Sequence, residues 1–183
     1  MEPRLKKTVV MVGMMGAGKS AVGKELAVKL GVPFLDSDAE IERAANASIA
    51  EIFARDGEAF FREKEAQVIA RLIDGEPCVL SVGGGAFLSE RTQRRITASG
   101  VSVWLKADLD TLWQRVKRKD TRPLLKTPNP YQTLADLMAA REPAYAQADL
   151  IVATEADYPI ETTADKVIEA LAKRPDVLDV ADA

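Results

Sequence analysis

The residues with the most informative spacing lie near the N-terminus, where Gly13–Ser20 (GMMGAGKS) fits the pattern G-x-x-x-x-G-K-[ST]. Glycines allow the backbone to curl until consecutive N–H groups face a phosphate. Lys19 adds a positive charge, and Ser20 offers a hydroxyl oxygen to a magnesium ion. The pattern therefore predicts a loop that binds the phosphates of a nucleoside triphosphate.

The flanking residues distinguish this interpretation from a glycine-rich turn that binds nothing. The apolar, β-branched run at 8–12 predicts a buried parallel strand, and apolar residues recur at helical spacing over 21–30. A strand, a glycine loop and a helix in this order direct the helix dipole at an anion. The context favours nucleotide binding.

A second polar group follows the short strand predicted at 32–36. Asp36 and Asp38 stand at the carboxyl end of that strand, where open parallel sheets bind their ligands. Between them, Ser37 precedes Glu40 by three residues, which predicts a capping box at the start of a helix.

Two further features suggest a ligand site. Arg62 lies near the start of a helix predicted at 59–73, where a cation is unfavourable against the helix dipole. A solvated surface arginine is the alternative. Three consecutive glycines, Gly83–Gly85, follow the strand predicted at 78–82. They indicate backbone that approaches a ligand closely, the alternative being a flexible turn.

Cations are concentrated between two predicted helices. Prolines interrupt this stretch and predict a loop. Such a run is usually a solvated face, but beside bound ATP it is a candidate lid over the transferred phosphate. The cations are Arg115, Lys117, Arg118, Lys119, Arg122 and Lys126.

The remaining pattern sets the fold class. Further strands are predicted at 101–105 and 150–153, with helices at 131–145 and 160–171. Five strands that alternate with helices predict an α/β fold with a parallel sheet covered on both faces. We expect one domain over residues 1–183, with a frayed acidic tail at about 175–183.

Composition narrows the possible functions. The 183 residues include no histidine, so acid–base chemistry falls to Asp, Glu, Lys or Tyr. Because Cys78 is the only cysteine, the chain cannot form an internal disulfide or a cysteine metal site. A net charge of −3 gives no nucleic-acid signature. Without an apolar run of membrane-spanning length or a signal peptide, we expect no membrane association and a cytoplasmic protein.

Six separated segments of the chain combine these motifs: GMMGAGKSAVGKELA (13–27), PFLDSDAEIE (33–42), IAEIFARDGEAFFREKE (49–65), GGGAF (83–87), RPLL (122–125) and REPAYAQADL (141–150). Taken together, these segments resemble the shikimate kinase family of bacterial type. The resemblance extends over about residues 9–152, and the segments occur in the order of the family.

The resemblance implies transfer of the γ-phosphate of ATP to the 3-hydroxyl of shikimate, in the route to chorismate and the aromatic amino acids. It implies a nucleoside-monophosphate-kinase-like P-loop fold with a short lid at about 116–128 and substrate-binding helices at about 37–62. The residues it assigns to ATP are Gly13, Gly16, Ala17, Gly18, Lys19, Ser20, Ala21, Arg122 and Arg115, with Arg118 competing with Arg115 for the adenine. Ser20 and Asp36 are assigned to Mg²⁺.

On the acceptor side, the resemblance assigns Asp38 to the reacting hydroxyl and Arg62 and Arg141 to the shikimate carboxylate. Asp38, Lys19 and Arg122 are the expected catalytic residues. The glycines approach the substrate, Gly84 being the expected N–H donor, and Phe53 and Phe61 form apolar walls, although helical spacing alone places both in the core.

Further expectations concern the pKa of Asp38, the backbone at Asn46, the oligomeric state and the alternative functions. Because Asp38 lies among cations, we expect a low pKa and a role mainly in orientation. Asn46 replaces a glycine common in the family, which asparagine can do because it tolerates the left-handed conformation. We expect a monomer; gluconate or a nucleoside monophosphate is the alternative acceptor, and a non-catalytic ATP-binding switch is less favoured.

Overall fold

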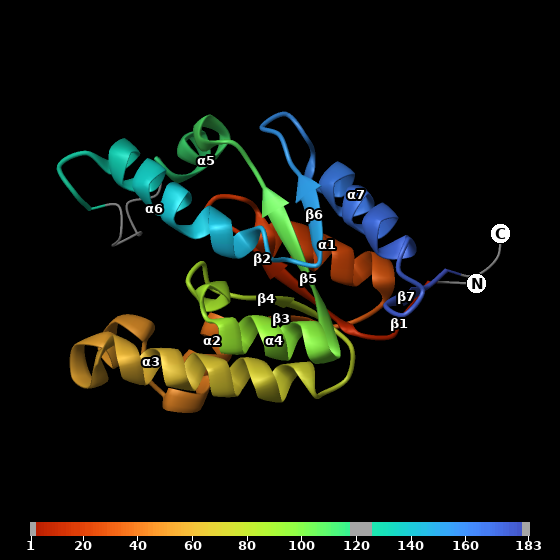
Figure 1. Cartoon of the computed structure of the whole chain (residues 1–183), viewed down its shortest axis with the longest axis horizontal. Helices are drawn as coiled ribbons and strands as arrows, with labels where there is room; N and C mark the ends of the chain where they lie inside the picture. The colour runs from red at the N-terminus through yellow and green to blue at the C-terminus, as the bar shows by residue number, and fades with distance from the viewer. Residues whose placement is uncertain (1–2, 118–125, 181–183) are drawn as a thin grey trace.

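The structure is a computed structural model that describes residues 3–117 and 126–180 (Figure 1). Its centre is a parallel sheet of five strands in the order β3-β4-β2-β5-β6. The strands are β2 (Thr8–Val12), β3 (Phe34–Asp36), β4 (Val79–Ser81), β5 (Gly100–Lys106) and β6 (Leu150–Ala153). The predicted five-stranded parallel sheet is confirmed, and its central strand β2 is buried along its whole length.

Helices cover both faces of the sheet (Figure 1). Helix α1 (Lys19–Leu30) packs against α7 (Ile160–Ala172) on one face, and α3 (Ile49–Ile73) packs against α4 (Glu90–Ser99) on the other. The remaining helical elements are α2 (Ser37–Ala45), the 3₁₀ turn η1 (Ala86–Leu88), α5 (Leu109–Val116) and α6 (Pro130–Tyr145). Within the described ranges, no helix has the length and apolar character needed to cross a membrane.

The start of α2 differs from the prediction. Asp36, not Ser37, caps this helix, because its Oδ1 accepts the N–H groups of Asp38 at 2.9 Å and Ala39 at 3.2 Å. Ser37 is already helical and buried, and its Oγ has no partner among the described residues. The predicted capping box does not form because the helix begins one residue earlier, with Asp36 as the residue that accepts the first free N–H groups.

The left-handed conformation expected at Asn46 is confirmed, because this residue ends α2 with φ 50°. The helix predicted at 59–73 is part of the longer α3, which has a kink at Gly57 (φ 87°, ψ 169°) where two helical segments join. The kink divides α3 into a short segment that carries Phe53 and a longer one that carries Arg62.

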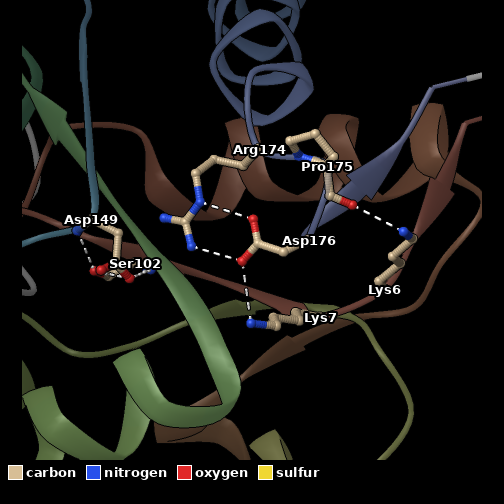
Figure 2. A network of polar contacts seen from close by, with 7 residues as sticks. All are labelled: Lys6, Lys7, Ser102, Asp149, Arg174, Pro175 and Asp176. Carbon is tan, nitrogen blue, oxygen red and sulfur yellow. Dashed lines mark hydrogen bonds and ion pairs between the residues drawn. The ribbon is translucent and has the colours of Figure 1, made fainter.

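Residues 175–180 pack against the start of the chain, so the prediction of a frayed tail is wrong for them. Strand β7 (Leu178–Asp179) pairs antiparallel with β1 (Arg4–Leu5) in a small second sheet that the sequence analysis missed. Figure 2 shows Arg174 donating to both oxygens of Asp176, at 3.1 and 2.9 Å.

We call residues 174–180 the terminal clasp. Further contacts connect the clasp to the start of the chain. Lys7 reaches the Asp176 carboxylate at 3.3 Å, and Lys6 donates to the Pro175 carbonyl at 3.0 Å (Figure 2). Hydrogen bonds from Arg174, followed by those from Lys7, hold the pKa of Asp176 well below its ordinary value. Hydrophobic burial anchors the clasp, since Val177 is 0% and Leu178 is 1% exposed.

We expect Leu178→Ala to lower the free energy of unfolding by about 2–4 kcal/mol, because it removes buried methyl groups and leaves a cavity. Val180→Ala, at a position 48% exposed, should change it by less than about 0.5 kcal/mol. Urea denaturation of both variants measures the difference. Equal, small effects would mean that the tail contributes nothing to stability.

Candidate functional site

The phosphate loop lies between the carboxyl end of β2 and the first turn of α1. Its glycines adopt backbone conformations that disfavour a side chain: φ is 146° at Gly13, 84° at Gly16 and 94° at Gly18. At Gly16, a β-carbon would also lie 2.7 Å from the side chain of Val116. The loop turns on these residues, so that α1 begins at Lys19 with its N-terminus at the loop.

The polar groups of the loop match the predicted phosphate site. Lys19 donates its Nζ proton to the carbonyl of Gly13 at 2.6 Å, which folds the side chain back over the loop. Ser20 and Ala21 occupy the first turn of α1, while Ala17 donates to the carbonyl of Met14 at 3.1 Å. A helix N-terminus, a lysine and a curled backbone therefore converge on one place.

Arg115 reaches the phosphate loop from α5. Its Nη1 donates to the carbonyls of Gly16 at 3.0 Å and Ala17 at 3.2 Å, and its Nη2 donates to Glu155 O at 3.3 Å. This places Arg115 beside the loop, while its stacking on the adenine stays a prediction. The other two cations of that assignment, Arg118 and Arg122, lie outside the described residues, as does most of the expected lid.

The glycine run after β4 meets three functional side chains. A β-carbon on Gly83 would lie 3.1 Å from Asp38 Oδ1, and one on Gly84 would lie 2.6 Å from Arg141 Nη1. One on Gly85 would lie 2.5 Å from Arg62 Nη2. The structure thus brings together the acceptor residues predicted from α2, α3 and α6, each over its own glycine.

The prediction that Asp38 has a low pKa is wrong for this structure. Burial, the largest cause, and the nearby Asp36 carboxylate together raise the pKa of Asp38 above its ordinary value of 3.8. Lys19 and Arg62 act in the opposite direction but do not outweigh burial. The cations near Asp38 lower its pKa by less than the loss of water around its carboxylate raises it.

Arg62 is held by Glu65, a residue that the sequence analysis missed. Arg62 Nη1 donates to Glu65 Oε1 at 2.8 Å, and its guanidinium lies 5.2 Å from the centre of the Phe61 ring. Glu65 is only 3% exposed, and burial raises the pKa of its carboxyl despite the arginine. Its place three residues after Arg62 on a helix was the available signal.

Arg141 and Tyr145 approach the same glycine from α6. Arg141 is 9% exposed and Tyr145 is 0% exposed. The Tyr145 hydroxyl donates to the carbonyl of Gly84 at 2.6 Å. Tyr145 was also missed, although it follows Arg141 by four residues on one helix face.

The two predicted wall residues differ in exposure. Phe53 is 36% exposed, whereas Phe61 is 3% exposed and packs in a small core with Ile41, Ile52 and Val68. Their ring centres are 4.8 Å apart. Phe61 therefore matches its core interpretation, and Phe53 is exposed enough for a ligand to contact it.

The residues assigned to Mg²⁺ offer oxygen atoms, which this cation prefers. Ser20 supplies a hydroxyl and Asp36 a carboxylate whose Oδ1 is already fixed by two backbone N–H groups. Within the described ranges, no group of three or more Asp, Glu, His or Cys side chains could hold a metal. One carboxylate and one hydroxyl suit a magnesium ion that is bound mainly by phosphates and water.

Comparison with known proteins identifies the family to which this chain is similar. The shikimate kinase family model matches residues 15–172. The chain belongs to the shikimate kinase family. The shikimate kinase of Cereibacter sphaeroides is 69% identical over 176 residues, which cover 96% of this chain and 88% of that protein. The shikimate kinase of Ruegeria pomeroyi is 65% identical, with coverage of 97% and 91%.

Solved structures agree with the shikimate kinase assignment. A shikimate kinase from Acinetobacter baumannii in complex with shikimate has a TM-score of 0.85 and 37% identity, covering 91% of this chain and 93% of that one. A gluconokinase from Sinorhizobium meliloti has a TM-score of 0.63 and 17% identity, covering 93% of this chain and 94% of that chain. The second likeness shows a shared P-loop kinase fold alone.

We expect Gly84→Ala to raise the KM for the acceptor at least tenfold while the KM for ATP changes less than about twofold. The new methyl displaces the Arg141 guanidinium, a flexible group, so the protein should still fold. Steady-state kinetics with each substrate varied in turn measure both constants.

Gly75→Ala is the matched control, because its β-carbon would meet only Leu72 O at 3.4 Å, an ordinary contact. An unchanged acceptor KM in Gly84→Ala would remove Arg141 from the acceptor site.

Proposed function

We propose that the site transfers the γ-phosphate of ATP to the 3-hydroxyl of shikimate, the reaction of the family to which the chain belongs. The supporting observation is the placement of Asp38, Arg141 and Arg62 over three consecutive glycines. A carboxylate can orient a hydroxyl, and two guanidinium groups can bind a carboxylate through paired hydrogen bonds. This set of groups suits a hydroxylated carboxylic acid better than a nucleobase.

The two halves of the site are adjacent, as phosphoryl transfer requires. Lys19, on the phosphate loop, is close enough to lower the pKa of Asp38, on the acceptor side. We assign Lys19 to the β- and γ-phosphates, together with the backbone N–H groups of Gly16–Ala21. Arg115 belongs beside the nucleotide, and we assign Arg122 to the transferred phosphate on the family resemblance.

Magnesium completes the proposed donor side. We assign its protein contacts to the Ser20 hydroxyl and to Asp36, the latter directly or through water. When bound, the ion neutralises charge on the phosphates that it contacts. The Asp36 carboxylate is preset for this role by its bonds to the start of α2.

Asp38 has the environment of a general base as well as an orienting group. Its pKa is raised, so its affinity for a proton is higher than that of an ordinary aspartate. In the proposed mechanism Asp38 accepts a hydrogen bond from the reacting hydroxyl and takes its proton as the new P–O bond forms. The arginines hold the acceptor in line with the phosphate during this step.

We further propose that the protein acts in the cytoplasm as a monomer that binds neither nucleic acid nor membranes. The described part of one chain supplies Lys19, Asp38, Arg62 and Arg141, so those groups need no second subunit. Size-exclusion chromatography with light scattering tests the oligomeric state.

A phosphotransfer assay with purified protein and ATP tests the acceptor. We expect turnover with shikimate and little or none with gluconate or nucleoside monophosphates. ATP binding without turnover of shikimate would favour the non-catalytic switch instead. Turnover of another acceptor in preference to shikimate would overturn the assignment of the two arginines.

Asp38→Asn should lower kcat by a factor on the order of 10²–10⁴, because an amide cannot take the proton. The Kd of ATP should change little. Asp165→Asn, which alters an exposed ion pair with Lys29, is the control and should leave both values unchanged. Near-normal turnover in Asp38→Asn would contradict the proposed role of this residue.

The same variant should be more stable than the parent at neutral pH without substrates. A carboxyl whose pKa is raised by folding destabilises the protein as the pH rises above the ordinary value of 3.8, and the full penalty is present above the raised pKa. Asp38→Asn removes that penalty. Thermal unfolding from pH 4 to 8 should show an advantage for the variant that grows with pH; a constant difference would contradict the pKa shift.

A further inference from the structure

Tyr145 lies between the two substrate sides of the site. Its ring packs against Trp104, with the ring centres 5.7 Å apart, and a β-carbon on Gly13 of the phosphate loop would lie 3.5 Å from Trp104 Cδ1. Its hydroxyl belongs to the acceptor side of the site, because it donates a hydrogen bond to Gly84 O at 2.6 Å. The hydroxyl is also 4.0 Å from the sulfur of Met14.

We propose that Tyr145 is a positioning residue that sets the acceptor site through Gly84 and Arg141. The inference rests on the proposed function, because it concerns how the acceptor carboxylate is held. Tyr145 itself need not touch either substrate.

The hydrogen bond fixes the peptide between Gly84 and Gly85. A trans peptide is planar, so holding the Gly84 carbonyl also sets the direction of the Gly85 N–H. Glycine lacks the side chain that would restrict this peptide. The Tyr145 bond therefore adds to the constraint from the bonds that Ala86 N–H and Leu88 N–H donate to the carbonyls of Gly83 and Gly85. The peptide joins the glycine under Arg141 to the glycine under Arg62, so its orientation affects the spacing of the two guanidinium groups.

Arg141 acts on the same hydroxyl. Burial raises the pKa of Tyr145, and the positive charge of the Arg141 guanidinium lowers it by a smaller amount. The net pKa is raised, so the phenol keeps its proton and remains a donor to Gly84 at neutral pH. Arg141 and the Tyr145 hydroxyl therefore meet at Gly84: a β-carbon on this glycine would lie 2.6 Å from Arg141 Nη1 and 3.6 Å from the Tyr145 hydroxyl oxygen.

The ring and the hydroxyl of Tyr145 have separable tasks. Phenylalanine retains the ring packed on Trp104 and loses the bond to Gly84 together with the longer 4.0 Å contact with Met14 Sδ. A deleted hydroxyl leaves a buried carbonyl without its donor, which costs more binding at the acceptor site than at the phosphate loop.

Steady-state kinetics of four proteins test the proposal: the parent, Tyr145→Phe, Arg141→Ala and the double variant. We expect Tyr145→Phe to raise the KM for shikimate about five- to tenfold and to change the KM for ATP less than about twofold. In the Arg141→Ala background, Tyr145→Phe should add less than about twofold, because both changes disable the same hold on the carboxylate.

Tyr131→Phe is the matched control on the same helix. Tyr131 also packs against a tryptophan, Trp113, and its hydroxyl donates to Asp110 at 3.3 Å, but the side chain is 38% exposed. This variant should retain the parent's constants for both substrates.

Other outcomes overturn the proposal in identifiable ways. Unchanged kinetics in Tyr145→Phe would mean that the hydroxyl does not position the acceptor. Parallel losses for ATP and shikimate, or losses that multiply in the double variant, would indicate a general packing role. If Tyr145→Phe cannot be folded, the ring and hydroxyl are not separable and the proposal also fails. Failure of the parent to phosphorylate shikimate would instead refute the proposed function.

Discussion

The site depends on three consecutive positions that have no side chain. Because Gly83–Gly85 have no β-carbons, three other side chains lie close to their backbone: Asp38, Arg141 and Arg62. The constraint is steric and local, but its consequences extend across the fold. Strand β4, which ends just before the glycines, lies between β3 and β2 in the sheet, so the run emerges between the Asp36–Asp38 segment and the phosphate loop. Parallel strand order thus brings the acceptor residues beside Lys19.

Charge burial is the second constraint, and it opposes stability. Burial is the largest cause of the raised pKa values of both Asp38 and Glu65. The negative charge of Asp38 raises the pKa of Glu65 further. Arg62 offsets part of the penalty by its 2.8 Å bond to Glu65, while Glu65 Oε2 has no partner among the described residues. Such a group is tolerated where it prepares a side chain for a ligand, because the arginine is held in place before the ligand arrives.

The sequence predicts the fold well because the signals for it are local. The phosphate loop, the alternation of strands and helices, and the left-handed Asn46 follow from short-range pattern. The failures involve contacts between distant residues. Val177 and Leu178 become buried only when the C-terminal segment pairs with β1, and no period in a nine-residue tail indicates this. The pKa of Asp38 depends on loss of water, which a count of neighbouring charges does not include. Glu65 and Tyr145 were missed although their helical spacing from Arg62 and Arg141 was visible, because polar residues on a helix are usually solvated.

The division between fold and acceptor choice follows from the same geometry. The gluconokinase of 17% identity shares the fold, so the sheet and its helices do not by themselves determine which hydroxyl is phosphorylated. The phosphate loop recognises groups common to every nucleoside triphosphate, through backbone N–H groups and one lysine. In the proposed function, acceptor choice lies in side chains that the fold delivers from separate helices: Asp38 on α2, Arg62 on α3 and Arg141 on α6. These three side chains meet at the glycine run. A shift of any one helix would therefore change which acceptors fit, because it would alter the distance at which the site holds the hydroxyl and the carboxylate of the acceptor. Tyr145, on α6 and bonded to Gly84, opposes such a shift by tying the helix of Arg141 to the loop beneath it.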